Sequence, residues 1–321
     1  PPPPSSTLSD DRRQRQMCIR DRFDTVDLND VAGGDGLLFV RHAVGVAGRG
    51  EVARVDVDEA AEFLAAIDHD GPGDGDLGGP IAVGSVPFVP DSRASAIVPE
   101  VLVRKHPDGT TSVTVILDDD APASAADRLA ADALAPHPPR PATAATWSIE
   151  PAVEVASYLA AVTEARSAVR NDELTKAVIA RPITVTADQP IDVHAVLRRL
   201  RASFGSSYRF SIDGFIGASP ELLVEVDGAV VRSHPLAGTA PRTGDAENDA
   251  RIAADLIAST KNQIEHRVVI DVVHDTLLPW ASYLDWEPEP SIVTVANVQH
   301  LGTRMEGRLS QPRPGVVELV R

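Results

Sequence analysis

Residues 217–242 read GASPELLVEVDGAVVRSHPLAGTAPR and say more about the fold than any other stretch of the chain. Within them, LLVEV and AVVRS are short apolar runs typical of β-strands. The dipeptide Asp227-Gly228 separates the two runs and suits positive φ at both centres of a two-residue hairpin turn. The two runs are therefore predicted to pair as antiparallel strands around this turn.

A second turn signal, Asp213-Gly214, lies just upstream, so residues 208–233 are predicted to form a meander of three short strands. Glu221, which ends GASPE, would then stand at a strand entrance. After the last strand, PLAGTAPR (235–242) holds two prolines, which cannot donate to a strand ladder, and Gly238, which can bring the backbone close to a ligand. This segment is predicted to be a binding loop, although taken alone it also fits a surface hairpin with a proline-rich turn.

Three further motifs accompany this stretch: KAVIAR (176–181), STKNQIEHRVVID (259–271) and NVQHLGT (297–303). In their order and spacing, the four motifs resemble those of the chorismate-utilising enzymes, and the chain is similar to the isochorismate synthases among them. The resemblance runs from about residue 23 to the last residue. It implies an α+β chorismate-binding fold, with large, mainly antiparallel sheets covered by helices.

Composition limits the possible partners. The chain has 321 residues, 43% of them apolar, and a formal charge of −17, which repels nucleic acid and anionic membrane surfaces. It contains one cysteine and no apolar run near the ~20 residues that span a bilayer. We therefore expect a cytoplasmic protein that binds neither nucleic acid nor a membrane. The resemblance implies a small-molecule substrate, chorismate. Because chorismate is a dicarboxylate, its site must reverse the acidic field locally with Lys, Arg or a divalent cation.

Both ends of the sequence are unusual. Residues 1–22 are rich in Pro, Ser and Arg, and MCIRDR within them looks like translated adapter sequence, so this tail is expected to be non-native or disordered. At the other end, GVVELVR (315–321) opens like a helix and has no stop signal. The fold is therefore expected to be incomplete at the C-terminus.

Residues 23–148 are predicted to form a β-rich subdomain. LLFVRHAVGVAG, PIAVGSVPFV and TSVTVILD are its strand runs, and residues 58–68 repeat with helical periodicity. The acidic, glycine-rich residues 68–79 lack the ligand spacing of a calcium loop and are predicted to be solvated. Residues 121–148, rich in Ala and Pro, are expected to be a loosely packed connection.

Residues 149–321 are predicted to be the chorismate-binding core. Apolar spacing indicates an amphipathic helix over residues 151–171, with Val155, Leu159 and Val162 on one face. The other elements expected here are strands at 174–182 and 291–301 and helices at 191–204, 245–259 and 261–279. Asp245 is the expected cap of the helix at 245–259, and residues 261–279 either form a separate helix or continue that one with a bend.

Lys176 and Glu221 are the candidate catalytic residues. From spacing alone, Lys176 reads as an exposed strand lysine and Glu221 as a turn carboxylate that caps nearby amides. The resemblance implies that Lys176, when neutral, is the general base for water attacking C2 of chorismate, and that Glu221 is the general acid for the departing C4 hydroxyl. Such a displacement needs both groups, because neither hydroxide attack nor hydroxide loss is easy at neutral pH.

Glu265 is the candidate metal ligand. By spacing it could simply pair with Lys261 on one helix face, which is worth a few tenths of a kcal/mol. The resemblance implies instead that it binds the Mg²⁺ that grips the ring carboxylate of chorismate, with a second carboxylate from a later segment.

The resemblance also implies that Ala237, Gly238 and Thr239 contact chorismate through backbone amides and a hydroxyl, and that His300 lines the same pocket. A satisfied core histidine fits His300 equally well. Arg242 either orders the loop or helps to neutralise the substrate.

Related activities share this scaffold. Anthranilate and aminodeoxychorismate synthases use ammonia and typically lack the lysine, so Lys176 favours water as the nucleophile and no glutaminase partner is expected. Salicylate synthase is the alternative activity, and a non-catalytic fragment is the alternative of another class. The sequence leaves the choice between menaquinone and siderophore synthesis open, and a monomer is our default expectation.

Overall fold

The computed structural model describes residues 12–18, 26–70, 79–89, 92–118, 120–135 and 145–320. The chain folds into two units. The first unit comprises Pro1–Pro139 and Val193–Glu221, and the second comprises Arg140–Asp192 and Leu222–Arg321. Residues 193–221 group with the N-terminal strands rather than with the rest of the predicted core.

The first unit is built on an eight-stranded sheet of order β13-β12-β2-β3-β8-β9-β1-β5. The strands are β1 (Arg12–Cys18), β2 (Leu37–Arg41), β3 (Val44–Arg49), β5 (Asp68–Asp70), β8 (Val101–Lys105), β9 (Thr111–Asp118), β12 (Tyr208–Ile212) and β13 (Phe215–Ser219). All neighbours are antiparallel except β1 and β5. A small sheet joins β4 (Ala53–Asp56), β7 (Ser95–Val98) and β6 (Val83–Ser85).

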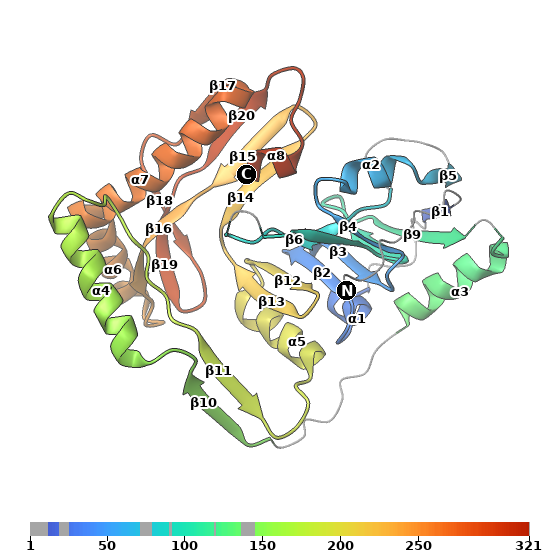
Figure 1. The fold of residues 1–321 in the computed structure, drawn as a ribbon, viewed down its shortest axis with the longest axis horizontal. Coiled ribbons are helices and arrows are strands. Elements are labelled where there is room, and N and C mark those ends of the chain that lie inside the picture. Colours follow the sequence, from blue (N-terminus) through green and yellow to red (C-terminus); the bar gives the residue numbers. More distant parts are fainter. Residues whose placement is uncertain are drawn as a thin grey trace. The chain divides into compact units, whose positions relative to one another are not determined.

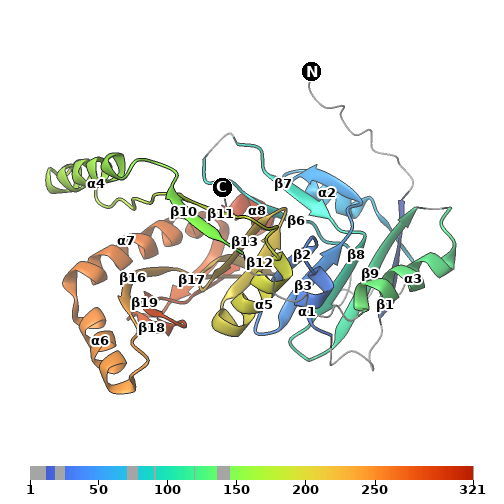
Figure 2. The ribbon, with the colours of Figure 1, turned by 90° about the horizontal axis from the view of Figure 1, so that it is seen from below.

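The described residues of this unit form the helices α1 (Leu28–Ala32), α2 (Ala60–Ala65), α3 (Ala123–Leu134) and α5 (Val193–Phe204). Helix α3 lies along β9, as Figures 1 and 2 show. It occupies the stretch predicted to be a loose connection, and that prediction is wrong for its twelve residues. Ala126, Ala130 and Ala133 are buried, because their small side chains let the helix approach the sheet closely.

The structure also places part of the N-terminal tail. Residues 12–18, expected to be disordered, form β1, which pairs with β9 from Arg12 opposite Asp118 to Cys18 opposite Ser112. Strand β8 occupies one edge of β9, and β1 satisfies the backbone groups of the other edge. The rest of residues 1–22, and residues 71–78 of the acidic loop, lie outside the described residues.

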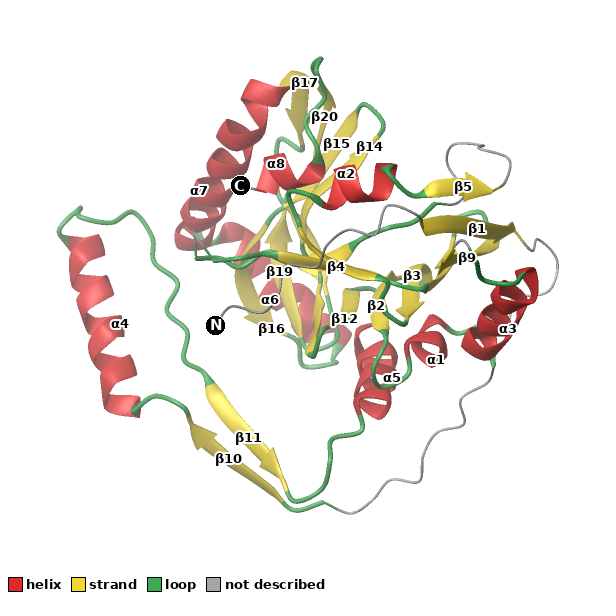
Figure 3. Cartoon of the chain, turned by 45° about the vertical axis from the view of Figure 1, so that its right-hand side comes forward, coloured by secondary structure: helices red, strands yellow, loops and turns green. Residues whose placement is uncertain are grey.

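The second unit holds two larger antiparallel sheets and a two-stranded ribbon. The first sheet has the order β14 (Leu222–Asp227), β15 (Val230–His234), β20 (Met305–Leu309) and β17 (Ala281–Trp286), and the second has the order β16 (Leu236–Pro241), β19 (Val298–Gly302) and β18 (Ser291–Thr294). The ribbon pairs β10 (Trp147–Pro151) with β11 (Ile183–Ala187). The helices are α4 (Val155–Arg170), α6 (Ala246–Ala258), α7 (Thr260–Leu277), the 3-10 turn η1 (Leu278–Trp280) and α8 (Val316–Val320). Figure 3 shows the helices and strands by colour.

One of the two predicted hairpin turns has the expected register. Asp213 and Gly214 have φ of 50° and 81° and connect β12 to β13. At the second hairpin, Asp227 remains in the strand opposite Val230, and the turn is Gly228-Ala229, with positive φ at Gly228 alone. A glycine at the first centre is what a type II′ turn requires. The predicted three-stranded meander is therefore wrong, because β12–β13 and β14–β15 lie in different sheets.

Three further predictions need correction. PLAGTAPR forms the strand β16, because Pro235 precedes the strand and Pro241 ends it at a sheet edge, where proline is tolerated. The predicted strand 291–301 is the hairpin β18–β19, whose turn at Val295 the continuous apolar run conceals. Residues 174–182 are irregular, and no described strand pairs with them.

The helix predictions in the core are confirmed. Asp245 caps α6 by accepting a hydrogen bond from Asn248 N–H at 2.8 Å, and α7 follows as a second helix. Helix α8 packs on β14, with Leu319 buried. The apolar face of α4 is exposed rather than covered, at 57% for Leu159. Among the described residues, no helix combines the length and the hydropathy needed to span a bilayer.

Candidate active site

Six of the seven predicted site residues belong to the second unit; these are Lys176, Ala237, Gly238, Thr239, Glu265 and His300. The seventh, Glu221, is the last residue of the first unit. It is exposed and directly precedes β14, so its predicted place at a strand entrance is confirmed. Its backbone N–H donates to Ser219 Oγ at 3.3 Å.

The antiparallel pairing of β16 with β19 brings two of these residues together. Thr239 lies opposite His300, and Thr239 Oγ1 is 3.0 Å from His300 Nδ1 in a hydrogen bond. Strand β16 is an edge strand, so its outer side presents backbone groups that the sheet does not use. The predicted contact through backbone amides is compatible with this edge.

Gly238 forms a bulge in β16. The register between the two strands shifts between Ala237 and Thr239, and Gly238 has φ of 80°, where a residue with a Cβ is strained. A Cβ built on Gly238 would lie 3.3 Å from Cβ of Asn262. The bulge therefore has a glycine for two reasons, its backbone conformation and the close approach of α7.

Helix α7 carries the candidate metal ligand. Glu265 Oε1 is 3.0 Å from Lys261 Nζ, so the simple helical ion pair is present. Lys261 is 78% exposed, and such a pair contributes little to stability. The pair leaves the second carboxylate oxygen of Glu265 available for another ligand.

One carboxylate meets only part of what a magnesium ion needs. Mg²⁺ is usually held by one or two carboxylates, with water and substrate oxygens completing its shell. Within the described ranges, no three His, Cys, Asp or Glu side chains gather in a way that would hold a metal ion. Glu265 thus fits as one ligand of a site that a second carboxylate, water and substrate oxygens would complete.

A buried histidine next to Glu265 was not singled out from the sequence. His266 is 1% exposed, and its Nε2 shares a hydrogen bond of 2.8 Å with Oγ1 of Thr303, which is fully buried. Burial, and then the nearby charges of Lys176 and Arg267, lower the pKa of His266 to about 4. The ring is therefore neutral at neutral pH. Its Nδ1 is buried and has no hydrogen-bond partner among the described residues.

Lys176 differs from the other cations of the site. It is half-buried within an otherwise exposed segment, and it makes no ion pair or hydrogen bond with the residues that the structure describes. Lys261 is paired with Glu265, and Arg242 is paired with Asp249 at 3.5 Å. The charge of Lys176 also contributes, after burial, to the lowered pKa of His266.

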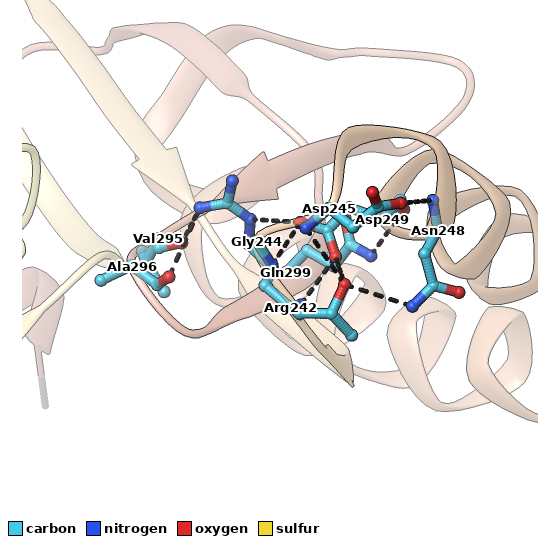
Figure 4. A network of polar contacts seen from close by, with 9 residues as sticks. Arg242, Gly244, Asp245, Asn248, Asp249, Val295, Ala296 and Gln299 are labelled. Carbon is cyan, nitrogen blue, oxygen red and sulfur yellow. Dashed lines mark hydrogen bonds and ion pairs between the residues drawn. The ribbon is translucent and has the colours of Figure 1, made fainter.

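Arg242 orders the chain that follows β16, one of the two roles considered for it. Its Nη1 donates to Val295 O at 2.7 Å, so it ties the end of β16 to the β18–β19 turn (Figure 4). Asp249 receives hydrogen bonds from N–H and Oγ1 of Thr243, at 2.7 and 2.8 Å, which together with Gly244 and Arg242 lower the pKa of Asp249. Gln299 Nε2 completes the network by donating to the backbone oxygen of Asp249 at 3.1 Å.

Comparison with known proteins gives the same family as the motifs. The family model of chorismate binding enzymes matches residues 47–320. The isochorismate synthase DhbC of Bacillus subtilis is 34% identical over 185 residues, which are 54% of this chain and 46% of that protein. The isochorismate synthase EntC of Escherichia coli is 36% identical over 152 residues, which are 46% of this chain and 39% of that protein. The chain thus spans about half the length of the curated relatives it matches.

A solved structure shares the architecture. The menaquinone-specific isochorismate synthase MenF of Escherichia coli aligns with a TM-score of 0.75 at 21% identity, over 96% of this chain and 73% of that one. At this identity the likeness shows the fold alone, and it confirms the predicted α+β chorismate-binding fold. Since the family match extends over most of the sequence, the chain belongs to the chorismate binding enzymes.

Proposed function

We propose that the chain is an isochorismate synthase, which converts chorismate to isochorismate with Mg²⁺ by attack of water at C2 and loss of the C4 hydroxyl. The relatives DhbC and EntC carry the name of this activity. The environment of Lys176 is the observation that carries the proposal. This lysine is half-buried, it is unpaired among the described residues, and its charge helps to lower the pKa of His266.

In this reaction, Lys176 acts as the general base. It must be neutral to accept a proton from water while the new bond to C2 forms. A lysine already engaged with a carboxylate would be held in its charged form, so an unpaired, half-buried lysine suits the role. The ring double bonds shift as the bond from C4 to its oxygen breaks.

Glu221 acts as the general acid at the other end of the displacement. It gives its proton to the departing hydroxyl, which leaves as water. One turnover therefore leaves Lys176 protonated and Glu221 ionised, and proton exchange with solvent restores both. Water is consumed at C2 and released at C4, so the atoms balance.

The remaining predicted residues bind the substrate. Backbone groups on the outer edge of β16 at Ala237 and Gly238, together with Thr239 and His300, would hold chorismate. Glu265 would hold the Mg²⁺, which supplies positive charge for a substrate carboxylate. The same proposal describes a cytoplasmic monomer that works without a glutaminase partner.

The test is turnover of chorismate by the purified chain. Wild type, Lys176→Ala and the control Lys105→Ala, whose lysine lies in β8 of the first unit, are incubated with chorismate and Mg²⁺, and the products are separated by chromatography. We expect isochorismate from wild type and from Lys105→Ala, and none from a folded Lys176→Ala. Salicylate as the product would instead favour the salicylate synthase alternative. Absence of any product from wild type, or full activity of Lys176→Ala, would refute the proposal.

A further inference from the structure

We infer that Asn262 contacts the substrate through its side-chain amide, as a further binding residue of the isochorismate synthase site on which this inference rests. The residue lies in the first turn of α7 and faces the Gly238 bulge of β16. The inference rests on where the side chain lies, on its unused hydrogen-bonding capacity and on how firmly its helix is held.

The position of Asn262 follows from the way α7 begins. Ser259 caps the helix by accepting a hydrogen bond from the backbone N–H of Asn262 at 3.4 Å, so that N–H is already used. The side chain extends toward β16, where its Cβ and Oδ1 lie 3.3 and 3.5 Å from the point that a Cβ on Gly238 would occupy. Asn262 therefore lies over the bulge whose backbone is proposed to bind chorismate. Helices α6 and α7 both contact β16, and both can be seen beside it in Figure 1.

The side-chain amide of Asn262 is able to form further hydrogen bonds. It is half-buried, and its side chain forms no hydrogen bond with any residue that the structure describes. Its neighbour Gln263 differs, because its amide donates to Ile257 O at 2.8 Å. Asn248 on α6 likewise donates to Thr243 Oγ1 at 3.2 Å. Because no described residue uses it, the amide of Asn262 keeps two N–H donors and one acceptor oxygen for a ligand.

The helix that presents Asn262 is fixed on the sheets of the second unit. The buried hydrogen bond between His266 and Thr303 joins α7 to the connection between β19 and β20. Glu265 is three residues after Asn262, so the two side chains share a helix face. The candidate metal ligand and the amide are thus presented side by side.

An uncharged amide suits this place. An amide N–H can donate to a hydroxyl or carboxylate oxygen of chorismate without adding charge. An aspartate has nearly the same shape but would add a negative charge against an anionic substrate, in a chain that already carries −17. Replacement of Asn262 by Asp therefore separates substrate contact from mere packing.

The experiment compares Asn262→Asp and Asn262→Ala with wild type and with Asn297→Asp. Asn297 is an exposed residue of the β18–β19 turn. Its replacement by Asp adds the same negative charge to the second unit, away from the Gly238 bulge. For each protein, KM and kcat for chorismate, chorismate binding by calorimetry and the midpoint of thermal unfolding are measured. We expect Asn262→Asp to raise KM and the Kd for chorismate by about 10- to 100-fold, the range for loss of a hydrogen bond to a charged group, with kcat much less affected. Asn262→Ala should raise KM by about tenfold, and Asn297→Asp should match wild type.

The outcomes distinguish this inference from the function on which it rests. A folded Asn262→Asp with KM and Kd within about twofold of wild type overturns the contact while leaving isochorismate synthesis intact. If wild type binds chorismate but forms no isochorismate, the proposed function fails, and the calorimetric comparison still decides the role of Asn262. If wild type neither binds nor converts chorismate, both fall together.

Discussion

His266 should make the protein less stable in mild acid, and the size of the effect can be estimated from the structure. The folded protein keeps this buried ring neutral, with its pKa lowered to about 4 from the ordinary 6.5. Between these two pH values, the unfolded chain binds a proton that the folded chain does not. The stabilisation is therefore complete above pH 6.5 and is lost as the pH falls toward and through about 4.

The whole shift corresponds to about 3 kcal/mol of unfolding free energy, because one pKa unit is worth about 1.4 kcal/mol. At about pH 5, roughly 2 kcal/mol of it should be lost, since the unfolded imidazole is almost fully protonated there and the folded one is not. His266→Gln removes the titrating group and keeps an amide N–H that can still donate to Thr303.

The assay is urea unfolding of wild type and His266→Gln at several values between about pH 8 and pH 5. Carboxylates and the other histidines titrate in both proteins, so the difference between the two pH profiles isolates His266. We expect wild type to lose about 2 kcal/mol more than the variant by pH 5. Parallel profiles would refute the reasoning, since they would mean that burial of this ring does not oppose its charge.

Substitutions at three further positions test the geometry around α7 and β16. Thr303→Val should lower the unfolding free energy by about 1–3 kcal/mol in urea titrations, because His266 Nε2 loses its 2.8 Å partner, whereas Thr303→Ser should cost less. Gly238→Ala should cost about 1–2 kcal/mol by the same measurement and raise KM for chorismate, because φ is 80° there; an unchanged stability would contradict this conformation. Arg242→Met should lower the thermal midpoint and cost about 1 kcal/mol, since it removes the 2.7 Å bond to Val295 O; a midpoint equal to that of wild type would show that this link does not hold β16.

Local signals in the sequence predicted the elements that local interactions form. Asp213-Gly214 forms its turn because both residues adopt positive φ, and Asp245 caps α6 because its side chain reaches an amide three residues away. Strand β9 has its predicted bounds, because a run rich in β-branched and apolar residues stands between the Asp108-Gly109 turn and the aspartates that begin at Asp118. Each of these features depends on a few neighbouring residues.

The errors arose where distant parts of the chain decide the outcome. Strand β12 pairs with β2, so the predicted meander is divided between two sheets, and no residue near Glu221 signals that division. The two prolines of PLAGTAPR favour a loop, yet both stand where an edge strand tolerates them. Ala-rich residues looked loosely packed, but α3 uses them to lie close to β9.

The candidate site shows the same difference between features that a motif predicts and features that distant contacts create. Motif resemblance supplied Thr239 and His300, and the structure pairs them across two strands. It passed over Asn262, His266 and Thr303, although all three stand within the quoted motifs. Their importance comes from contacts with residues tens of positions away, and hydrophobic periodicity cannot reveal such contacts.

The charges of the site connect the proposed base, Lys176, with the proposed divalent cation at Glu265. A dicarboxylate substrate approaching a chain of charge −17 needs local positive charge. Of the three cations Lys176, Arg242 and Lys261, the last two are already paired with carboxylates, so Lys176 carries the only uncompensated charge of this set. A lysine that acts as a base must give up that charge, however, and cannot neutralise the substrate while it is neutral. The base role of Lys176 therefore strengthens the case for a divalent cation at Glu265, because without one this set of residues would offer the dianion no net positive charge at the moment of water attack.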